Sequence, residues 1–451
     1  MNNIFLIISF FYLNLNHFNN CLIELPMKIF NDQIQIPKYQ KHSFNNSYKS
    51  HLKSFLYEKE EENGDEITLV PSTLFSLSLK IGTPKKLFNL LIDTGSTIMW
   101  IPSIISNDSF DIKHHYDPKN SSSCIKLNEK FEEIYGSGNC SGEYYYDVLN
   151  YIGDKEFKLK FGVAEKTHFN VDGTDGVLGL SRNYDEQSKS FISMLNYANI
   201  AKSRIFSLKI NDNSTNNFSA KFYIGKHPDF DKKEVVTCEL LHYSLYLKEL
   251  WACEMNALII GNNSYYFKAK KNIPVLFDTG TNVIMLPLVY LEEMNTNLDS
   301  FGCIIKLISS TFESVSYQLI CQGDNYPEFK FVIDGHTFIL PNEYGYYIKN
   351  KIAYSRIIFI DNKNEDGNVF IIGSPFFLIF HVLFDADSKE LHFYSENTNY
   401  LIKGSWWNRK HIIIVIFAGI LLIGFILMIV FFIRFKKAEK EKEKLENFIW
   451  S

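Results

Sequence analysis

The sequence predicts an all-β chain folded as two lobes and followed by a C-terminal transmembrane helix. Apolar and polar residues alternate in many short segments, as they do in half-buried strands. Two near-identical pentapeptides, each entered through an apolar run, indicate two similar halves. An unbroken apolar run at 412–433 is long enough to cross a bilayer.

The strand prediction depends on the period of the apolar residues. Asp334-Gly335 adds a hairpin signal, since this dipeptide favours a tight turn between two such segments. Few helices are expected, and the best candidates are 190–199 and 289–297. The alternation is clearest in three segments, residues 75–81, 157–161 and 329–333.

The two pentapeptides carry the strongest functional signal. They are Asp93-Thr94-Gly95-Ser96-Thr97 and Asp278-Thr279-Gly280-Thr281-Asn282. Each places one carboxylate at the end of an apolar run that predicts a buried strand. An ionised carboxylate buried there without a partner would be very unfavourable. Two carboxylates in contact share one proton over a working pH range, so the pair supplies a general acid and a general base. Two unrelated strand-end turns are the alternative, which the matching apolar flanks disfavour.

These motifs and their flanks resemble those of the pepsin-family aspartic proteases, and the resemblance covers about residues 33–396. It implies the bilobal pepsin-like fold, peptide substrates and no cofactor. It also implies that Asp93 is the protonated acid and Asp278 the ionised base that activates a water. Supporting roles fall to the remaining loop residues, Thr94, Gly95, Ser96, Thr279, Gly280 and Thr281.

A second motif, Tyr135-Gly136-Ser137-Gly138, resembles the family's flap, a hairpin that closes over the substrate. Alone it would be an ordinary hairpin turn. Its spacing from Asp93 and the presence of Trp100 favour the flap. The resemblance implies that Tyr135 covers the site and contacts Trp100, while Ser137 and Gly138 offer backbone contacts to the peptide.

Two apolar-apolar-Gly segments, 177–179 and 371–373, match the family's paired segments beside the catalytic loops. Core packing is their main expected role. The chain departs from the family pattern at Asn282, where relatives mostly have Ser, and at Ser374, where many have Asp. Four apolar residues are also expected to line or back substrate subsites, so that hydrophobic residues flank the cut: Leu91, Val177, Leu276 and Ile371.

The cysteine count fits an oxidising compartment. Cys21 is expected to leave with a signal peptide, which leaves six cysteines. Proximity in the sequence favours three local disulfides, although other connectivities remain open and one or two pairs could stay reduced. The favoured pairs are Cys124 with Cys140, Cys238 with Cys253, and Cys303 with Cys321.

The N-terminal residues predict a signal peptide at 1–21 and a prosegment at 22–66. The prosegment is basic and ends in an acidic run. A basic segment over an acidic cleft would loosen when the carboxylates protonate, which indicates a zymogen; a plain N-terminal extension is the alternative. The two lobes are assigned to 67–238 and 239–396.

The C-terminal residues predict a stalk at 397–411, a membrane span at 412–433 and a cytoplasmic tail at 434–451. Trp406 and Trp407 precede the apolar run as interfacial anchors, and basic residues follow it. A buried core helix is disfavoured by its length, and a lipid-anchor signal by the polar tail. Signal and anchor together predict a single-pass type I protein of the secretory pathway or cell surface, with the catalytic part lumenal or extracellular.

Charge and composition exclude other classes. The net charge of −5 and the lack of a basic stripe argue against nucleic-acid binding. The twelve His are scattered, without a metal-binding spacing. We therefore expect a monomeric, membrane-anchored aspartic endopeptidase made as a zymogen and acting on proteins or peptides. The alternatives are a catalytically silent binding or receptor protein of the same fold and a structural surface protein.

Overall fold

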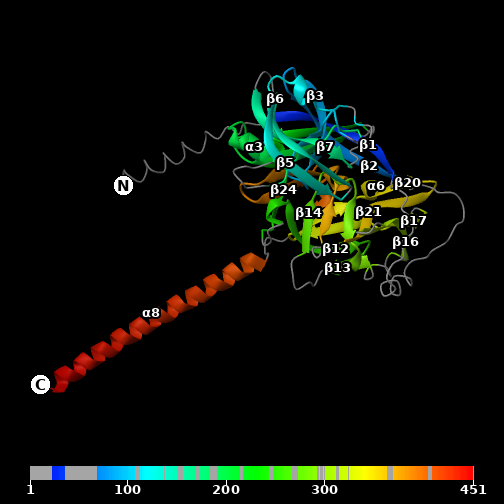
Figure 1. Ribbon diagram of the computed structural model, residues 1–451. Coiled ribbons are helices and arrows are strands. Elements are labelled where there is room, and N and C mark those ends of the chain that lie inside the picture. The colour runs from blue at the N-terminus through cyan, green and yellow to red at the C-terminus, as the bar shows by residue number, and fades with distance from the viewer. Residues whose placement is uncertain are drawn as a thin grey trace, which may run out of the picture. The chain divides into compact units, whose positions relative to one another are not determined.

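The computed structural model divides into two units, 1–402 and 403–451, which are described separately. The first unit is built from strands in the part of the chain that the structure describes (Figure 1). The described residues are 23–35, 69–106, 112, 114–136, 138–150, 156–168, 173–182, 190–213, 217–242, 247–266, 273–291, 294, 298, 300–310, 314–323, 325–362, 369–404 and 409–449.

The first sheet has thirteen strands among the described residues, in the order β11-β24-β23-β9-β10-β1-β2-β3-β8-β4-β7-β6-β5. Its strands are β1 (Ile23–Gln35), β2 (Leu69–Ile81), β3 (Lys86–Asp93), β4 (Trp100–Pro102), β5 (Ile125–Tyr135), β6 (Gly138–Asn150), β7 (Glu156–Thr167), β8 (Val177–Gly179), β9 (Ile205–Asn213), β10 (Asn217–Ile224), β11 (Val236–Glu239), β23 (Phe380–Asp385) and β24 (Glu390–Ser395).

The second sheet has twelve strands in the described ranges, with the main order β16-β17-β21-β15-β22-β14-β12-β18-β19-β25. Strand β13 pairs with β12, and β20 pairs with β21. The strands are β12 (Ala252–Ile260), β13 (Asn263–Tyr266), β14 (Ile273–Phe277), β15 (Ile284–Pro287), β16 (Cys303–Ser310), β17 (Ser314–Gln322), β18 (Phe329–Ile333), β19 (His336–Leu340), β20 (Tyr346–Lys349), β21 (Ile352–Asn362), β22 (Phe370–Ile372) and β25 (Leu401–Ile402).

Helices in the first unit are short, which confirms the all-β prediction. Helix α3 lies within the predicted 190–199 segment. Within 289–297 the described residues are the end of a 3-10 turn, Val289 and Tyr290, and two residues in helical conformation, Leu291 and Met294. The helices are η1 (Pro118–Asn120), α3 (Phe191–Tyr197), α4 (Asp229–Lys232), η2 (Leu247–Glu249), η3 (Leu288–Tyr290), α6 (Asn342–Gly345), α7 (Ser374–Phe377) and η4 (Thr398–Tyr400).

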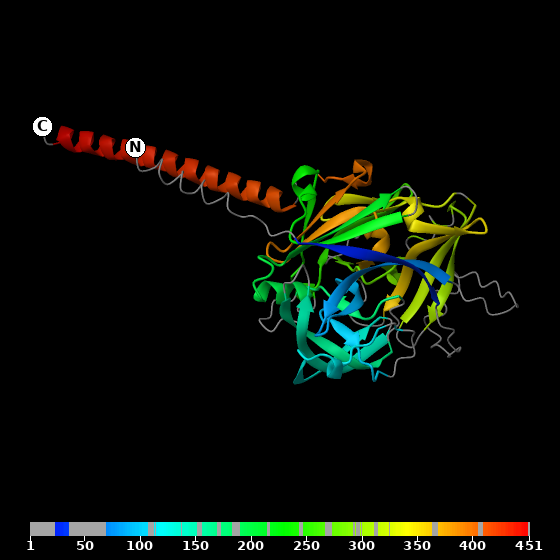
Figure 2. The same ribbon diagram turned by 90° about the horizontal axis from the view of Figure 1, so that it is seen from above.

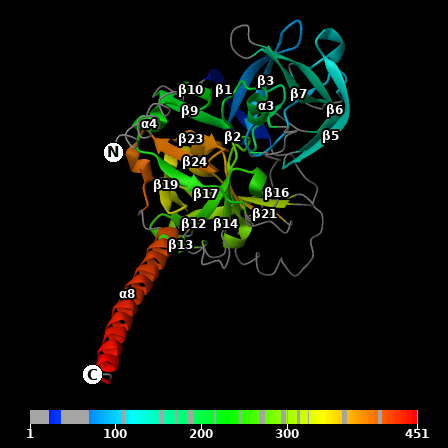
Figure 3. The ribbon, with the colours of Figure 1, turned by 90° about the vertical axis from the view of Figure 1, so that its left-hand side faces the viewer.

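The two halves of the chain share the first sheet. Strands β23 and β24 come from the C-terminal half, yet β23 pairs with β9 and β24 pairs with β11 (Figure 3). Phe206 of β9 stacks on Phe384 of β23 at 4.5 Å between ring centroids, and Trp251 meets both rings edge-on. The buried aromatic area joins the lobes in one hydrophobic core, so they form one structural unit.

Strand β1 comes from the predicted prosegment and is part of this sheet. It lies between β10 and β2, with Met27 opposite Ala220 on one side and Leu77 on the other (Figure 2). The side chains of Leu25 and Met27 are buried. The remainder of the predicted prosegment, 36–66, and the predicted signal peptide lie outside the described residues.

The second unit is one long helix, α8 (Arg409–Ile449). Its segment Phe417–Lys442 is long and apolar enough to cross a membrane, and none of it is buried in the structure. The helix includes the predicted span 412–433 and extends beyond it in both directions.

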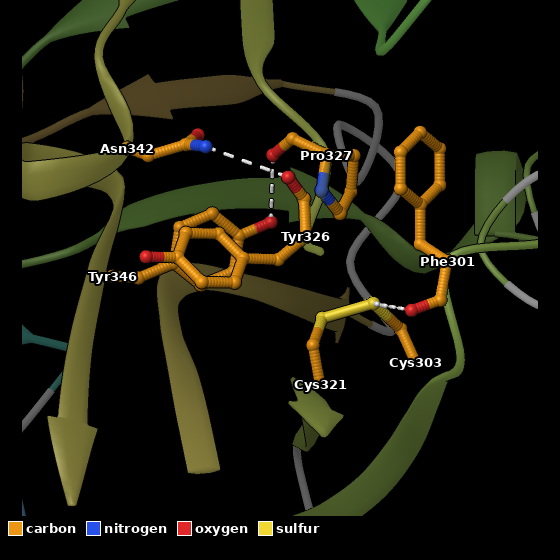
Figure 4. Close-up of a disulfide and its surroundings, with 7 residues drawn as sticks. All are labelled: Phe301, Cys303, Cys321, Tyr326, Pro327, Asn342 and Tyr346. Carbon is orange, nitrogen blue, oxygen red and sulfur yellow. Dashed lines mark hydrogen bonds between the residues drawn. A yellow bond between two sulfur atoms is a disulfide. The ribbon is translucent and has the colours of Figure 1, made fainter. Parts of the chain in front are cut away.

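One of the three predicted disulfides is present. Cys303 and Cys321 face each other across β16 and β17 and are joined, beneath Phe301 and near the Tyr326–Tyr346 ring pair (Figure 4). The other four cysteines are free thiols, so those pairings are wrong for this structure.

For Cys124 and Cys140 the physical reason is their position in three dimensions. Cys124 contacts Tyr116, whereas Cys140 is buried in a different cluster, with Trp100 and Tyr144. Cys238 does lie beside Cys253, but the two meet as hydrogen-bonded thiols, not as a disulfide.

Candidate active site

The two pentapeptides meet at the junction of the sheets. Strand β3 ends at Asp93, and β14 ends one residue before Asp278. The Thr94 Oγ1 donates to the carbonyl of Phe277 at 2.7 Å, and the Thr279 Oγ1 donates to the carbonyl of Ile92 at 2.7 Å. Each Thr hydroxyl also accepts the other Thr's backbone N–H, at 3.0 and 3.1 Å. These four buried bonds fix the loops against each other across the lobes.

Each carboxylate is held by donors from its own loop. The Gly95 N–H donates to the Asp93 Oδ1 at 2.9 Å, and the Ser96 hydroxyl donates to the Asp93 Oδ2. In the second loop the Gly280 N–H donates to the Asp278 Oδ1 at 2.9 Å, and the Thr281 Oγ1 donates to the Asp278 Oδ2 at 2.6 Å. The matching donors orient the two acids symmetrically.

The glycines leave the space in which the two acids approach each other. A Cβ at Gly95 would lie 2.8 Å from the Asp278 carboxyl carbon. A Cβ at Gly280 would lie 2.6 Å from the Asp93 Oδ1. Each carboxylate therefore packs directly on the opposite loop, and any larger residue would displace it.

The electrostatics favour one shared proton. Burial raises the pKa of Asp93 well above its usual range, and the charge of neighbouring Asp278 raises it further, against the Ser96 and Gly95 donors. Asp93 is 6% exposed, and Asp278 is half-buried. The direction agrees with Asp93 as the protonated acid, which stays a prediction because coupled acids titrate as a pair.

The apolar-apolar-Gly segments lie beside the catalytic loops. Strand β8 runs parallel to β3 and β22 parallel to β14, with Asp93 opposite Gly179. A Cβ at Gly179 would lie 2.3 Å from the Thr97 carbonyl carbon, and one at Gly373 2.0 Å from the Val283 oxygen. Only glycine allows this approach. The Oγ of Ser374 is buried and has no hydrogen-bond partner among the described residues.

The predicted flap is the hairpin of β5 and β6. Tyr135 lies opposite Gly138 at its tip, and the Trp100 Nε1 donates to the Tyr135 hydroxyl at 2.8 Å. Burial, and then the charge of Asp93, raise the pKa of Tyr135, so its phenol stays protonated near the acids. Gly136 belongs to the turn, and Ser137 lies outside the described residues.

The predicted apolar subsite residues fall in two places. Leu91 and Val177 are buried with Trp100 in the cluster on which Tyr135 packs. Ile371 is half-buried in β22, and Leu276 is buried in β14.

The second lobe has a corresponding cluster that the sequence patterns do not predict. It consists of Val283 and Ile358 with Met285, Ile308 and Tyr347 packed against them; we call it the second-lobe cluster. The only signal for it in the sequence is the apolar run after the second pentapeptide, which does not show what lies opposite.

Among the described residues, no three or more His, Cys, Asp or Glu side chains gather as a metal site. The arrangement is instead suited to acid–base chemistry on a water and a carbonyl, because two hydrogen-bonded carboxylates meet beside a hairpin that can cover them.

Comparisons with known proteins agree with this geometry. Residues 75–395 match the family model described as eukaryotic aspartyl protease. The chain is 26% identical to pepsin A of Gallus gallus over 70% of this chain and 82% of the relative. It is 27% identical to vacuolar protease A of Aspergillus fumigatus, covering 69% and 76% of the two chains. It is 24% identical to cathepsin D of Rattus norvegicus, covering 69% and 78%.

Proposed function

Because the chain belongs to the eukaryotic aspartyl protease family, we propose that it is an aspartic endopeptidase whose acids are Asp93 and Asp278. The observation that carries the proposal is the loop pair: buried Asp93 and half-buried Asp278 are in hydrogen-bonding contact, and each is held by a Gly N–H and a hydroxyl. A member that had lost activity would have no need to keep this costly arrangement.

In the proposed mechanism the ionised acid takes a proton from a water bound between the carboxylates. The protonated acid donates to the carbonyl oxygen of the scissile bond, and the water oxygen attacks the carbonyl carbon. We assign the base to Asp278 and the acid to Asp93, in line with the raised pKa of Asp93. The hydrogen bond from Trp100 holds Tyr135 where the flap can cover the substrate.

We also propose that the protein is made as a zymogen. Strand β1, from the predicted prosegment, supports this idea because it is paired on both edges inside the first sheet. Cleavage after β1 would leave this strand in the sheet, or let the new N-terminus replace it. Incubation at mildly acidic pH, with N-terminal sequencing of the product, tests whether a cut falls between 36 and 66.

The membrane placement is a proposal as well. The apolar helix α8, together with the predicted signal peptide, supports a type I anchor in the secretory pathway or at the cell surface. The named relatives include a vacuolar protease, which fits that route. The Asn-, Lys- and Ile-rich composition suggests the plasmepsin branch, and plasmepsin VII is the candidate within it on overall length alone.

The experiment compares the full chain with Asp93→Asn and Asp278→Asn on peptides that carry adjacent apolar residues. We expect at least a hundredfold loss of cleavage in both variants, since each acid has its own role. Asp231→Asn is the matched control, because that carboxylate is 66% exposed and pairs with Lys226 at the surface. Equal activity in all four proteins would contradict the assignment. Binding of a statine-type inhibitor without any cleavage would favour the alternative, a silent binding protein.

A further inference from the structure

Strand β21 of the second lobe carries a guanidinium group, that of Arg356, which the proposed mechanism does not use. Arg356 lies in β21 and is half-buried, with its Nε shielded from solvent. That Nε has no hydrogen-bond partner in the described part of the chain, and no carboxylate among the described residues forms an ion pair with the side chain. Burial lowers the pKa of this guanidinium, which stays charged at any pH in which proteins fold.

The strand register places Arg356 beside the catalytic loop. Strand β15 begins three residues after Thr281 and runs parallel to β21, with Ile284 opposite Ile357 and Met285 opposite Ile358. Extending this register by one residue sets Val283 beside Arg356. Arg356 therefore neighbours Val283, which is two residues after Thr281 in the loop that holds Asp278.

The face of the sheet can also be identified. Alternate residues of β15 and β21, such as Ile284 and Ile357, belong to the main core. Val283 and Ile358 instead form the second-lobe cluster on the opposite face, and Tyr347 packs against them. Arg356 is two residues before Ile358 in β21, so its side chain projects from the same face of the sheet as this cluster. Tyr135 packs on the corresponding cluster of the first lobe. Under the proposed function, in which Tyr135 covers the substrate, both clusters face the bound peptide.

The equivalent position in the first lobe provides a contrast. There β4 runs parallel to β7, with Trp100 opposite Gly162, and the residue two before Gly162 is Lys160. Lys160 is neutralised by the Glu129 carboxylate at 2.6 Å. The two lobes therefore each place a cation at this position, but only the cation of the first lobe has an acidic partner among the described residues.

A half-buried guanidinium without a carboxylate binds an incoming carboxylate strongly, because the low local dielectric strengthens the charge-assisted hydrogen bonds. We propose that Arg356 forms a substrate subsite for an acidic side chain, so that the enzyme prefers Asp or Glu at one position near the apolar residues of the cut. The inference rests on the proposed function, since it assumes that a substrate peptide binds along the face of the sheet that carries Arg356 and the second-lobe cluster.

The test uses the full chain and a set of peptides with one apolar cleavage pair and Glu, Gln or Lys at each neighbouring position in turn. At pH 5.5 a substrate Glu is ionised. We expect a preference for Glu over Gln of about tenfold in kcat/KM at one position, mainly through KM. Below about pH 4 the preference should disappear as the substrate carboxylate protonates.

Variants assign the preference to the guanidinium. Arg356→Gln should remove the preference while cleavage of the Gln peptide stays within about threefold of the parent. Arg356→Lys should keep part of it, since the charge remains but the forked geometry is lost. Lys160→Gln, at the equivalent position of the first lobe, is the control and should leave the preference unchanged. A Glu-to-Gln ratio near one at every position, or a ratio that survives in Arg356→Gln, would overturn the proposal.

A binding measurement separates this inference from the proposed function. Uncleavable statine-type peptides with Glu or Gln at the same positions are titrated against the parent and Arg356→Gln. One outcome is that neither the parent nor Arg356→Gln cleaves any of the cleavable peptides, yet the parent binds the uncleavable Glu peptide about tenfold more tightly than the variant does. In that case the subsite stands and the proposed catalysis fails. If the peptides bind equally to both proteins, or to neither, the subsite is refuted.

Discussion

The buried imidazole of His381 should make the folded protein less stable as the pH falls. His381 lies in β23 and is 2% exposed, and its Nδ1 accepts the backbone N–H of Ile210 in β9 at 3.1 Å. A neutral ring can accept this bond, whereas a protonated ring cannot. Burial lowers the pKa of His381 to about 4, although the Glu396 carboxylate, 3.7 Å from the Nε2, acts in the opposite direction.

The sign and size follow from proton binding. Between pH 6.5 and pH 4 the unfolded chain binds a proton at this residue and the folded chain does not, so the free energy of unfolding decreases as the pH falls. At about 1.4 kcal/mol per pH unit, the difference from the ordinary histidine pKa amounts to roughly 3 kcal/mol. The loss begins near pH 6.5 and is complete near pH 4.

The assay is urea unfolding of the parent and of His381→Asn at several pH values between 7 and 4. Asp278→Asn is used as the background of both proteins to prevent self-cleavage. Asn does not titrate, and its amide oxygen can replace the Nδ1 as acceptor for Ile210. We expect the stability difference between parent and variant to shift by roughly 3 kcal/mol in favour of the variant from pH 7 to pH 4. Parallel pH curves for the two proteins would refute the reasoning.

Three further predictions concern the acids and the disulfide. Asp93→Asn should raise the free energy of unfolding at pH 7, because an acid whose pKa is raised by folding destabilises the fold at every pH above its ordinary unfolded-state pKa, and denaturant titration measures the change; a loss of stability would contradict it. Gly280→Ala should reduce kcat at least a hundredfold by displacing Asp93, while Gly345→Ala, whose Cβ would lie 3.4 Å from its nearest neighbour, should leave kcat unchanged. Replacing Cys303 and Cys321 by Ser should lower stability by about 3 kcal/mol, as expected for a loop that links residues 18 apart, and reduction of the parent should give the same loss.

Much of the fold could be predicted from the sequence because the signals are local. The alternation at 329–333 depends only on the two faces of a strand, and β18 has those bounds. The disulfide predictions were less successful, because closeness in the sequence does not set the distance between thiols. Cys303 and Cys321 meet because β16 and β17 pair directly and set the two residues opposite each other. Cys124 lies just before β5, whereas the residue of β5 opposite Cys140 is Glu133, so these two thiols are apart.

The candidate site shows the same division. The two pentapeptides predicted that Asp93 and Asp278 lie together, since a repeated buried Asp requires a partner, and the structure brings their loops into contact. The strand β1 in the first sheet, the crossing of β23 and β24 into it and the isolated charge of Arg356 had no signal in the sequence. Each of these features depends on the pairing of strands that are far apart in the sequence.

The sequence by itself identified the candidate groups: two acids on glycine turns, a tyrosine proposed as the flap residue with its tryptophan, and an apolar C-terminal segment. Only the tertiary structure decided how these groups act together. The hydrogen bonds between Thr94 and Thr279 and the desolvation of Asp93 exist only when residues far apart in the chain are brought into contact. Burial and partner distance set the energy of a charge, and neither is a property of the local sequence.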